Sequence, residues 1–316
     1  MDTFATTPVV LFAYARPDLL QRTLACLREN HVPLIYAFSD GPATPEKGPA
    51  VAQVRELLRA VDWCQTRLVE RPNNLGLGLS IRTGVAEVFK EHESLIVFED
   101  DLICVPGTYD YLCAALRRYR DDPRVMSVTA WTHARVTPPG VGGQPYFDGR
   151  AECWVWGAWR RSWAGMEATA LEMIRACEAQ GIDPWRYGAD LPSMAERELK
   201  QNIWAVRFLY LHILRRALCL RPPWSMVEHI GFDPRATNAA TATDWANPPF
   251  RPCPPLPTAW PEPVERRECS GLWRKACGGK PVARPFRWAG WVLRLARQAF
   301  GVVKRRTPLL RKARFP

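Results

Sequence analysis

Short apolar runs alternate with segments of helical periodicity through the first 130 residues of the chain. The apolar runs predict buried strands at residues 8–14, 34–38, 66–69 and 94–98. Helices are predicted between and after them, at residues 19–28, 50–61, from a glycine-rich loop to about residue 90, and at 109–120. This alternation predicts an α/β fold of the Rossmann-like kind, in which helices flank a mostly parallel sheet.

Polar side chains follow the predicted strands at the points where the strands end. Arg16, Asp40 and Asn74 come after the first three strands, and the fourth runs directly into Glu99-Asp100-Asp101. Ligands of open α/β sheets bind beyond the carboxyl ends of the strands. We therefore expect these side chains to converge on one site.

The second half of the chain has a less regular pattern. A strand is predicted at residues 125–128 and another at 218–220, with helical stretches at 167–180 and 194–214. Four tryptophans lie in the segment 153–163. Eight prolines lie in residues 248–263, which predicts an extended wrap or linker.

The three consecutive carboxylates repel one another at the end of an apolar strand, and a bound divalent cation would relieve that repulsion. Carboxylate oxygens suit Mg²⁺ or Mn²⁺, and Mg²⁺ usually completes its shell with phosphate oxygens and water. This chemistry favours a nucleotide diphosphate site. Simpler interpretations stay open: the acidic cluster could be a solvated strand end or a helix N-terminus, and Asp40 could only form an Asx turn.

The net charge of +11 is distributed unevenly along the chain. Residues 271–316 contain thirteen Lys and Arg and no acidic residue, which leaves −2 for residues 1–270. A nucleic-acid-binding face across the whole fold is therefore disfavoured. Residues 286–306 place Trp and Val opposite Arg and Lys at helical spacing, which is the pattern of a helix at an anionic membrane surface. A terminal helix packed on the body and a segment that binds single-stranded nucleic acid are the alternatives.

Other classes of protein are disfavoured by simple counts. No apolar run approaches the ~20 residues of a transmembrane helix. The first residues lack the basic start of a signal peptide, and ten scattered cysteines without a CxxC motif predict reduced thiols. We therefore expect a cytoplasmic protein that is held peripherally at the inner membrane if the tail binds lipid.

An ordered set of segments resembles the GT-A nucleotide-sugar glycosyltransferases, in particular a bacterial family 2-like group. The group is distantly similar to N-acetylglucosaminyltransferases that carry Glu-Asp-Asp as their DxD-type motif. The resemblance covers roughly residues 8–240. The segments that carry it are Pro8–Arg16, Ser39–Pro42, Asn73–Gly84, Val97–Leu102, Trp154–Trp163, Asn202–Arg207 and His229–Asn238.

The resemblance implies a nucleotide-sugar donor, UDP-linked in the first instance, and Mn²⁺ or Mg²⁺. Asp101 would be the direct metal ligand, and Asp100 would face the ribose or the metal shell. Glu99 would face the donor sugar, Asp40 the base and Arg16 the nucleotide.

Three further donor-site candidates lie in loops of the same segments. Asn74 belongs to the glycine-rich loop, and Asp233 belongs to the loop 231–238, which the resemblance places over the donor. Trp156 belongs to the patch Trp154–Trp159, which would help to form the sugar and acceptor site; packing in the core is the alternative.

The expected catalytic base is missing. The resemblance implies an Asp directly before the Trp of a W-x-x-R segment, but Asn202 and Ile203 precede Trp204 here. An inverting transfer needs a carboxylate to accept the proton of the acceptor hydroxyl. Substitutes are Glu198 and Glu196 first, then Asp190 and Asp233.

The sequence thus predicts three regions: a GT-A domain at residues 1–245, a proline-rich wrap or linker at 246–270 and a basic tail at 271–316. The predicted activity is metal-dependent transfer of a hexosyl or N-acetylhexosaminyl group to a glycan or lipid-linked acceptor, with inversion. A degenerate domain that binds glycan or nucleotide is one alternative. A sugar-phosphate nucleotidyltransferase is another, although residues 8–18 lack that class's glycines and Lys.

Overall fold

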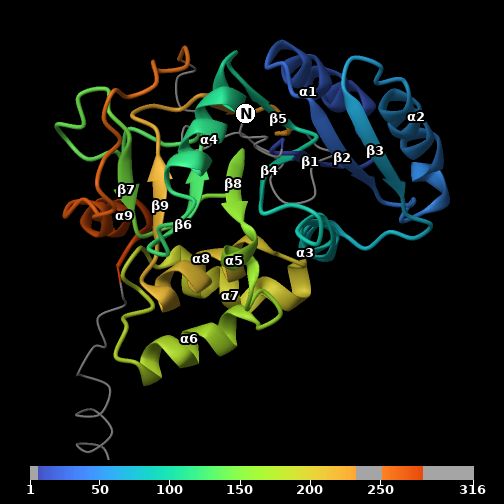
Figure 1. Cartoon of the computed structure of the whole chain (residues 1–316). Coiled ribbons are helices and arrows are strands. Elements are labelled where there is room, and N and C mark those ends of the chain that lie inside the picture. Colours follow the sequence, from blue (N-terminus) through green and yellow to red (C-terminus); the bar gives the residue numbers. More distant parts are fainter. Residues whose placement is uncertain (1–5, 233–250, 280–316) are drawn as a thin grey trace, which may run out of the picture. The chain divides into compact units, whose positions relative to one another are not determined.

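An eight-stranded mixed sheet forms the centre of the computed structural model, which describes residues 6–232 and 251–279 (Figure 1). The strand order is β3-β2-β1-β4-β8-β6-β9-β7, and a second sheet pairs β10 with β5. The strands are β1 (Val9–Ala13), β2 (Leu34–Ser39), β3 (Gln65–Glu70), β4 (Ser94–Glu99), β5 (Leu102–Cys104), β6 (Val125–Thr129), β7 (Tyr146–Asp148), β8 (Trp156–Trp159), β9 (Leu218–Arg221) and β10 (Val227–His229).

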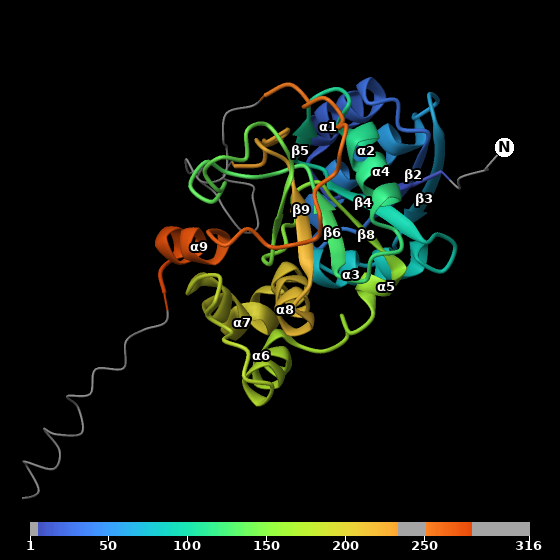
Figure 2. The ribbon, with the colours of Figure 1, turned by 60° about the vertical axis from the view of Figure 1, so that its left-hand side comes forward.

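Helices cover the large sheet and gather at one end of it. They are α1 (Pro17–Glu29), the 3₁₀ helix η1 (Pro45–Lys47), α2 (Gly48–Arg59), α3 (Leu77–Val88), α4 (Thr108–Arg118), α5 (Arg160–Trp163), α6 (Ala170–Ala179), α7 (Asp190–Gln201), α8 (Ala205–Arg215) and α9 (Cys269–Cys277). Figure 2 shows α6, α7 and α8 together as one group.

The first half of the chain folds as its pattern predicts. Strands β1, β2, β3 and β4 pair in parallel, and β1 and β2 are buried along their whole length. Because these strands are buried on both faces, they are continuous apolar runs. The predicted α/β fold with a mostly parallel sheet is confirmed.

Strand β8 is the main departure from the predicted sheet. It lies between β4 and β6 and runs antiparallel to both. Its sequence, Trp-Gly-Ala-Trp, belongs to the patch that we expected at the sugar site. Gly157 stands here because a Cβ atom would press on Leu116 and Val128 side chains. Strand β8 thus runs opposite to both of its neighbours in the middle of the sheet. The segment before it therefore lies at the edge where β4 ends.

The predicted helix at 194–214 is two helices. Asn202 interrupts it with a left-handed φ of 51°, and its side chain donates a hydrogen bond to the Leu75 carbonyl at 3.2 Å. A Cβ atom at Gly78 would collide with the Asn202 backbone. The glycine-rich loop and the α7–α8 junction therefore depend on each other.

The proline-rich segment lies against the body where it is described. The Trp260 ring contacts Tyr111 and Tyr119, and the Tyr119 hydroxyl donates to the Pro261 carbonyl at 2.6 Å. Helix α9 then buries Trp273, and the first compact unit extends to residue 279. This unit therefore includes residues 271–279 of the segment predicted as the basic tail, and the division into three regions stays a prediction. The predicted amphipathic helix lies outside the described residues.

No helix among the described residues combines the length and apolar character needed to cross a membrane.

Helix α8 contains a buried histidine whose ring is fully hydrogen-bonded. His212 in α8 is fully buried, with Nδ1 2.8 Å from the Phe208 carbonyl and Nε2 2.8 Å from the Ser127 hydroxyl. The carbonyl can only accept, so Nδ1 donates and Nε2 accepts from Ser127. The neutral ring satisfies both bonds.

Burial lowers the pKa of His212 to about 4. The unfolded chain has an ordinary histidine pKa near 6.5, so it binds a proton that the folded state does not bind between these values. Stability should fall as pH decreases through this window, by about 2 kcal/mol between pH 7 and 5 from this group. Denaturant unfolding at both pH values tests this. His212→Gln should lose that part of the slope, whereas His31→Asn at an exposed helix end should keep it; equal slopes in all three proteins would contradict the assignment.

Candidate active site

A cavity of about 410 Å³ opens at the carboxyl ends of β1, β2 and β4. All six strand-end residues singled out in the sequence line it: Arg16, Asp40, Asn74, Glu99, Asp100 and Asp101. The predicted convergence is therefore present in the structure.

Arg16 bridges the two aspartates of the acidic cluster. Its Nη2 lies 2.8 Å from Asp100 Oδ1 and 2.6 Å from Asp101 Oδ2. The other oxygen of Asp100 accepts the backbone N–H of Tyr14 at 2.7 Å. Ala15, which connects Tyr14 to Arg16, has a φ of 46°, a strained value for a residue with a side chain. The chain thus turns sharply after β1 so that both the amide and the guanidinium face the aspartates.

The acidic cluster carries more negative charge than Arg16 neutralises. Burial raises the pKa of Glu99, and the charges of Asp101 and Asp100 raise it further against the opposing effect of Arg16. Burial also raises the pKa of Asp100, with Arg16 acting in the opposite direction. An additional cation in the cavity would stabilise all three ionised carboxylates.

Asp40 forms hydrogen bonds with the glycine-rich loop, which forms another wall of the cavity. Its Oδ2 accepts the Leu75 N–H at 2.9 Å, while Oδ1 lies 3.0 Å from Arg71 Nη1 and 3.2 Å from the Ser80 hydroxyl. Asn74 stabilises the same loop by accepting the Gly76 N–H at 2.9 Å. Asp40 therefore does not form the Asx turn that was the alternative, because its carboxylate bonds to the distant residues Arg71, Leu75 and Ser80, and it also borders the cavity.

Sequence reasoning assigned no role to several cavity residues. The most informative is His229 in β10, whose Nε2 lies 3.7 Å from Asp101 Oδ2. Gly231 also lines the cavity, and a Cβ atom there would collide with the Asp101 carboxylate. Tyr14, which follows β1, and Lys47 of η1 also line the cavity. His229 begins one of the family-like segments, but only the pairing of β10 with β5 shows that it reaches the acidic cluster.

The oxygen atoms at the cavity suit a divalent cation whose remaining coordination positions are filled by water or a bound phosphate. Asp101 Oδ1 is buried and has no hydrogen-bond partner among the described residues. His229 Nδ1 accepts the Gly231 N–H at 3.1 Å, so Nε2 of the neutral ring carries its proton on the side of the Asp101 carboxylate, 3.7 Å away. No group of three or more His, Cys, Asp or Glu in residues 6–232 and 251–279 is arranged to hold a metal on its own. A metal bound through Asp101 would therefore take its other ligands from water and phosphate.

Trp156 lies elsewhere, which corrects its predicted role as a donor contact. It is fully buried, with its ring 5.6 Å from Trp163, 5.3 Å from Trp204 and 4.7 Å from Phe208. The side chain packs in the core because β8 is an interior strand. The core alternative is the correct interpretation for this tryptophan.

The structure likewise does not bring Glu198 to the cavity. Glu198 is 2% exposed and forms a buried ion pair with Arg207. Its Oε2 accepts the Ala170 N–H at 2.8 Å, and Arg207 also donates to the Glu167 carbonyl at 2.9 Å. This carboxylate joins α6, α7 and α8, so its observed contacts support a structural role and not that of a base.

The other predicted bases have different positions. Asp190 forms a two-point ion pair with Arg150, at 2.7 and 3.0 Å. Glu196 is exposed on α7 and does not line the cavity. Asp233 lies outside the described residues. Neither Asp190 nor Glu196 is thus supported as the catalytic base.

No protein-family model matches the chain, and no curated protein sequence matches it. Among solved structures, it is similar to a mannosyltransferase from Pyrobaculum calidifontis in complex with GDP-Man and Mn²⁺, at 16% identity and a TM-score of 0.36. That match covers 50% of this chain and 45% of the mannosyltransferase chain, so it spans less than half of the latter.

Two other similar structures are a UDP-glucose pyrophosphorylase complexed with UDP-glucose and a putative nucleotide-diphospho-sugar transferase from Desulfovibrio desulfuricans. The pyrophosphorylase is 12% identical, with 69% of this chain and 91% of that chain covered and a TM-score of 0.35. The transferase is 10% identical, with 51% and 69% covered and a TM-score of 0.31. The functional proposal therefore rests on the site itself.

Replacing Glu198 should destabilise the fold and leave nucleotide binding intact. Glu198→Gln leaves the Arg207 charge buried without its counter-ion, which costs about 3 kcal/mol of unfolding free energy. Glu196→Gln, on the same helix but exposed, should change stability by less than about 0.5 kcal/mol. Denaturant unfolding measures both. A Glu198→Gln protein as stable as Glu196→Gln would contradict the structural role.

Proposed function

We propose that the chain is a metal-dependent glycosyltransferase that moves a sugar from a nucleotide-sugar donor, in the first instance a UDP-sugar, to a hydroxyl of a glycan or lipid-linked acceptor. The observation that carries this proposal is the Asp100–Asp101 pair, with its buried unpartnered oxygen, in a strand-end cavity. The arrangement suits a cation and a diphosphate together.

Each cavity residue has a proposed role that follows from its position. Asp101 Oδ1, together with water and phosphate oxygens, would hold Mn²⁺ or Mg²⁺, which would supply charge stabilisation for the leaving diphosphate when it is bound. Arg16 orients both aspartates through its two ion pairs, and Glu99 borders the space for the donor sugar. Lys47 lies at an exposed edge of the cavity, where an ammonium group can meet phosphate or base oxygens.

One assay separates this proposal from its alternatives. Protein with Mn²⁺ and a panel of UDP- and GDP-sugars should release nucleoside diphosphate. A nucleotidyltransferase would instead exchange pyrophosphate between a nucleoside triphosphate and a sugar phosphate. Metal-dependent binding without either reaction would identify a binding module. No binding of any nucleotide sugar would reject the proposal.

Asp101→Asn should remove metal-dependent donor binding. A donor at one hundred times its Kd stabilises a protein by about 2.7 kcal/mol, which appears as a rise in Tm. The variant should lose most of the rise that needs Mn²⁺ because the amide is a weaker ligand without charge. Asp121→Asn, at a largely exposed position, should keep the full rise. A normal Mn²⁺-dependent rise in Asp101→Asn would exclude Asp101 as the ligand.

The basic tail gives a separate proposal about location. We propose that the basic tail, residues 271–316, holds the protein at an anionic membrane through the part that follows α9, residues 280–316, on the strength of its basic and aromatic pattern. Each basic residue near anionic lipid contributes about 1 kcal/mol, so binding should be reversible and weakened by salt. In flotation assays the full chain should float with anionic but not with neutral liposomes. A chain that ends at Gly279 should not float with the anionic liposomes. Equal flotation of both chains would refute the proposal.

A further inference from the structure

Two buried cysteines meet where α1 packs on β5, the short strand that follows the acidic cluster. Cys26 lies on α1 and Cys104 ends β5, and their side chains are 6% and 5% exposed. The two Sγ atoms are 3.4 Å apart. The Cys104 N–H also donates to Cys26 Sγ at 3.0 Å, so the main chain of one residue already lies close to the sulfur of the other. A disulfide needs the sulfurs to approach from 3.4 Å to about 2.0 Å.

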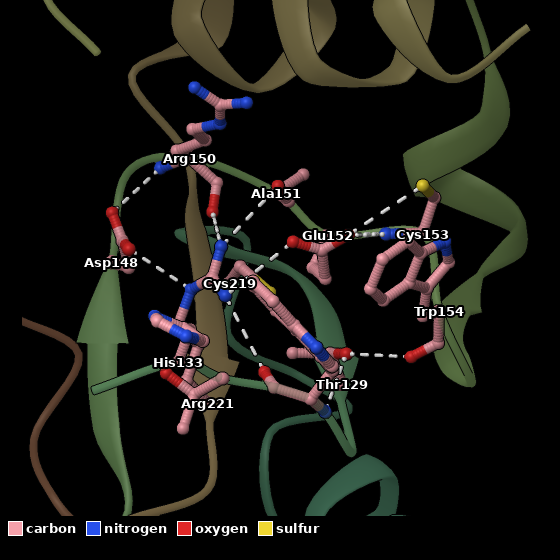
Figure 3. Close-up of polar contacts among 12 residues, drawn as sticks. Thr129, His133, Asp148, Arg150, Ala151, Glu152, Cys153, Trp154, Cys219 and Arg221 are labelled. Atoms are coloured by element: carbon pink, nitrogen blue, oxygen red, sulfur yellow. Dashed lines mark hydrogen bonds and ion pairs between the residues drawn. The ribbon is translucent and has the colours of Figure 1, made fainter. Parts of the chain in front are cut away.

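Other cysteines of this protein have different surroundings. Figure 3 shows Cys153, whose Sγ lies 3.6 Å from Glu152 Oε1. Burial raises the pKa of Cys153, and the charge of Glu152 raises it further, which makes this thiol a poor nucleophile. In the part of the chain that the structure describes, Cys26 and Cys104 are the one pair of cysteine sulfurs joined by a hydrogen bond. Two thiols can therefore combine here without a large movement of the backbone.

The two thiols of the pair differ in how readily they ionise. Hydrogen bonding with Cys104 lowers the pKa of Cys26, and burial acts in the opposite direction. Burial raises the pKa of Cys104 well above its usual value. The thiolate is the form of cysteine that reacts with an oxidant. Cys26 is therefore the sulfur that reacts first, and Cys104 is placed to react with the product.

Helix α1 and strand β5 also hold the acidic cluster between them. Arg16, directly before α1, forms ion pairs with both aspartates of the cluster. The Thr23 hydroxyl of α1 donates to the Asp100 carbonyl at 2.9 Å. Because residues three positions apart lie on the same face of a helix, Thr23 and Cys26 face the same stretch of chain. A change in the packing of Cys26 against Cys104 therefore reaches the turn of the acidic cluster through Thr23.

We infer that Cys26 and Cys104 form a dithiol–disulfide couple, and that its oxidation by a peroxide alters the acidic cluster. The disulfide itself does not depend on the proposed function. Only its effect on donor binding rests on that proposal.

Hydrogen peroxide suits a buried pair because its size is close to that of water. The Cys26 sulfur bonds to one peroxide oxygen as the O–O bond breaks, and the other oxygen leaves as hydroxide, which takes up the proton that Cys26 released. The Cys104 sulfur then displaces the hydroxyl group from the sulfenic acid of Cys26, and this group leaves with the Cys104 proton as a second water. In total, two thiols lose two hydrogens and two electrons, and one peroxide becomes two waters.

The test treats the reduced full chain with hydrogen peroxide, blocks the remaining thiols with N-ethylmaleimide under denaturing conditions, and maps the digest by mass spectrometry. A peptide pair joined through Cys26 and Cys104 should appear, two hydrogens lighter than the reduced peptides, and dithiothreitol should separate it. Cys64→Ser, at a partly exposed position on the same sheet, should keep this crosslink, and Cys26→Ser should lose it. Absence of the pair from oxidised wild-type protein, or a crosslink from Cys104 to Cys253 in its place, would overturn the inference.

Metal-dependent donor binding gives the second measurement. Oxidised wild-type protein should lose much of the Mn²⁺-dependent Tm rise that a nucleotide sugar gives the reduced protein, because the shortened sulfur contact displaces Thr23 from the turn that it holds. Cys26→Ser after the same peroxide treatment should keep its full rise. Equal rises in oxidised and reduced wild-type protein would overturn the link to the acidic cluster. Absence of nucleotide-sugar binding by the reduced protein would overturn the proposed function, whereas the mapped crosslink would still support the couple.

Discussion

The ion pairing of Arg16 with Asp100 and Asp101 is the constraint on which the site depends. Three consecutive carboxylates at the end of a buried strand would repel one another and lose solvation, so the surrounding chain has to compensate them. The strained turn at Ala15 brings Arg16 and the Tyr14 amide to the aspartates. In addition, the Thr23 hydroxyl donates to the Asp100 carbonyl at 2.9 Å and thereby joins α1 to the turn after β4.

Buried charges serve two different purposes in this molecule. The Glu198–Arg207 and Asp148–Arg221 pairs match each buried charge with a counter-ion, and further hydrogen bonds join them to the surrounding chain. Such pairs favour one arrangement of the elements around them. Asp101 differs in its position. Other buried polar atoms of the described residues, such as Tyr111 Oη and Arg150 Nε, also lack a hydrogen-bond partner, but Asp101 Oδ1 belongs to a carboxylate that lines the cavity.

Much of the fold and half of the site could be predicted from the sequence. The apolar runs identify β1, β2 and β4, and parallel strands bring their carboxyl ends to one edge whatever the details of packing. Arg16, Asp40 and the acidic cluster follow from that geometry alone. The roles of Trp156 and Glu198 could not be predicted in this way, because a tryptophan or glutamate near a family-like motif can point into the core as well as into a cavity. Burial decides between these positions, and burial depends on which strands are interior.

The local pattern of the sequence determined the α/β architecture and the position of the acidic cluster, since strand and helix periodicity depend on neighbouring residues. The tertiary structure decided where β8 inserts, where helix α7 ends, and that His229 and the segment before β8 approach the acidic cluster. These features depend on pairings between residues far apart in the chain, such as Val97 with Trp156 and His229 with Leu102. A one-dimensional pattern does not specify such pairings, because their stability comes from packing and charge compensation that exist only once the chain has folded.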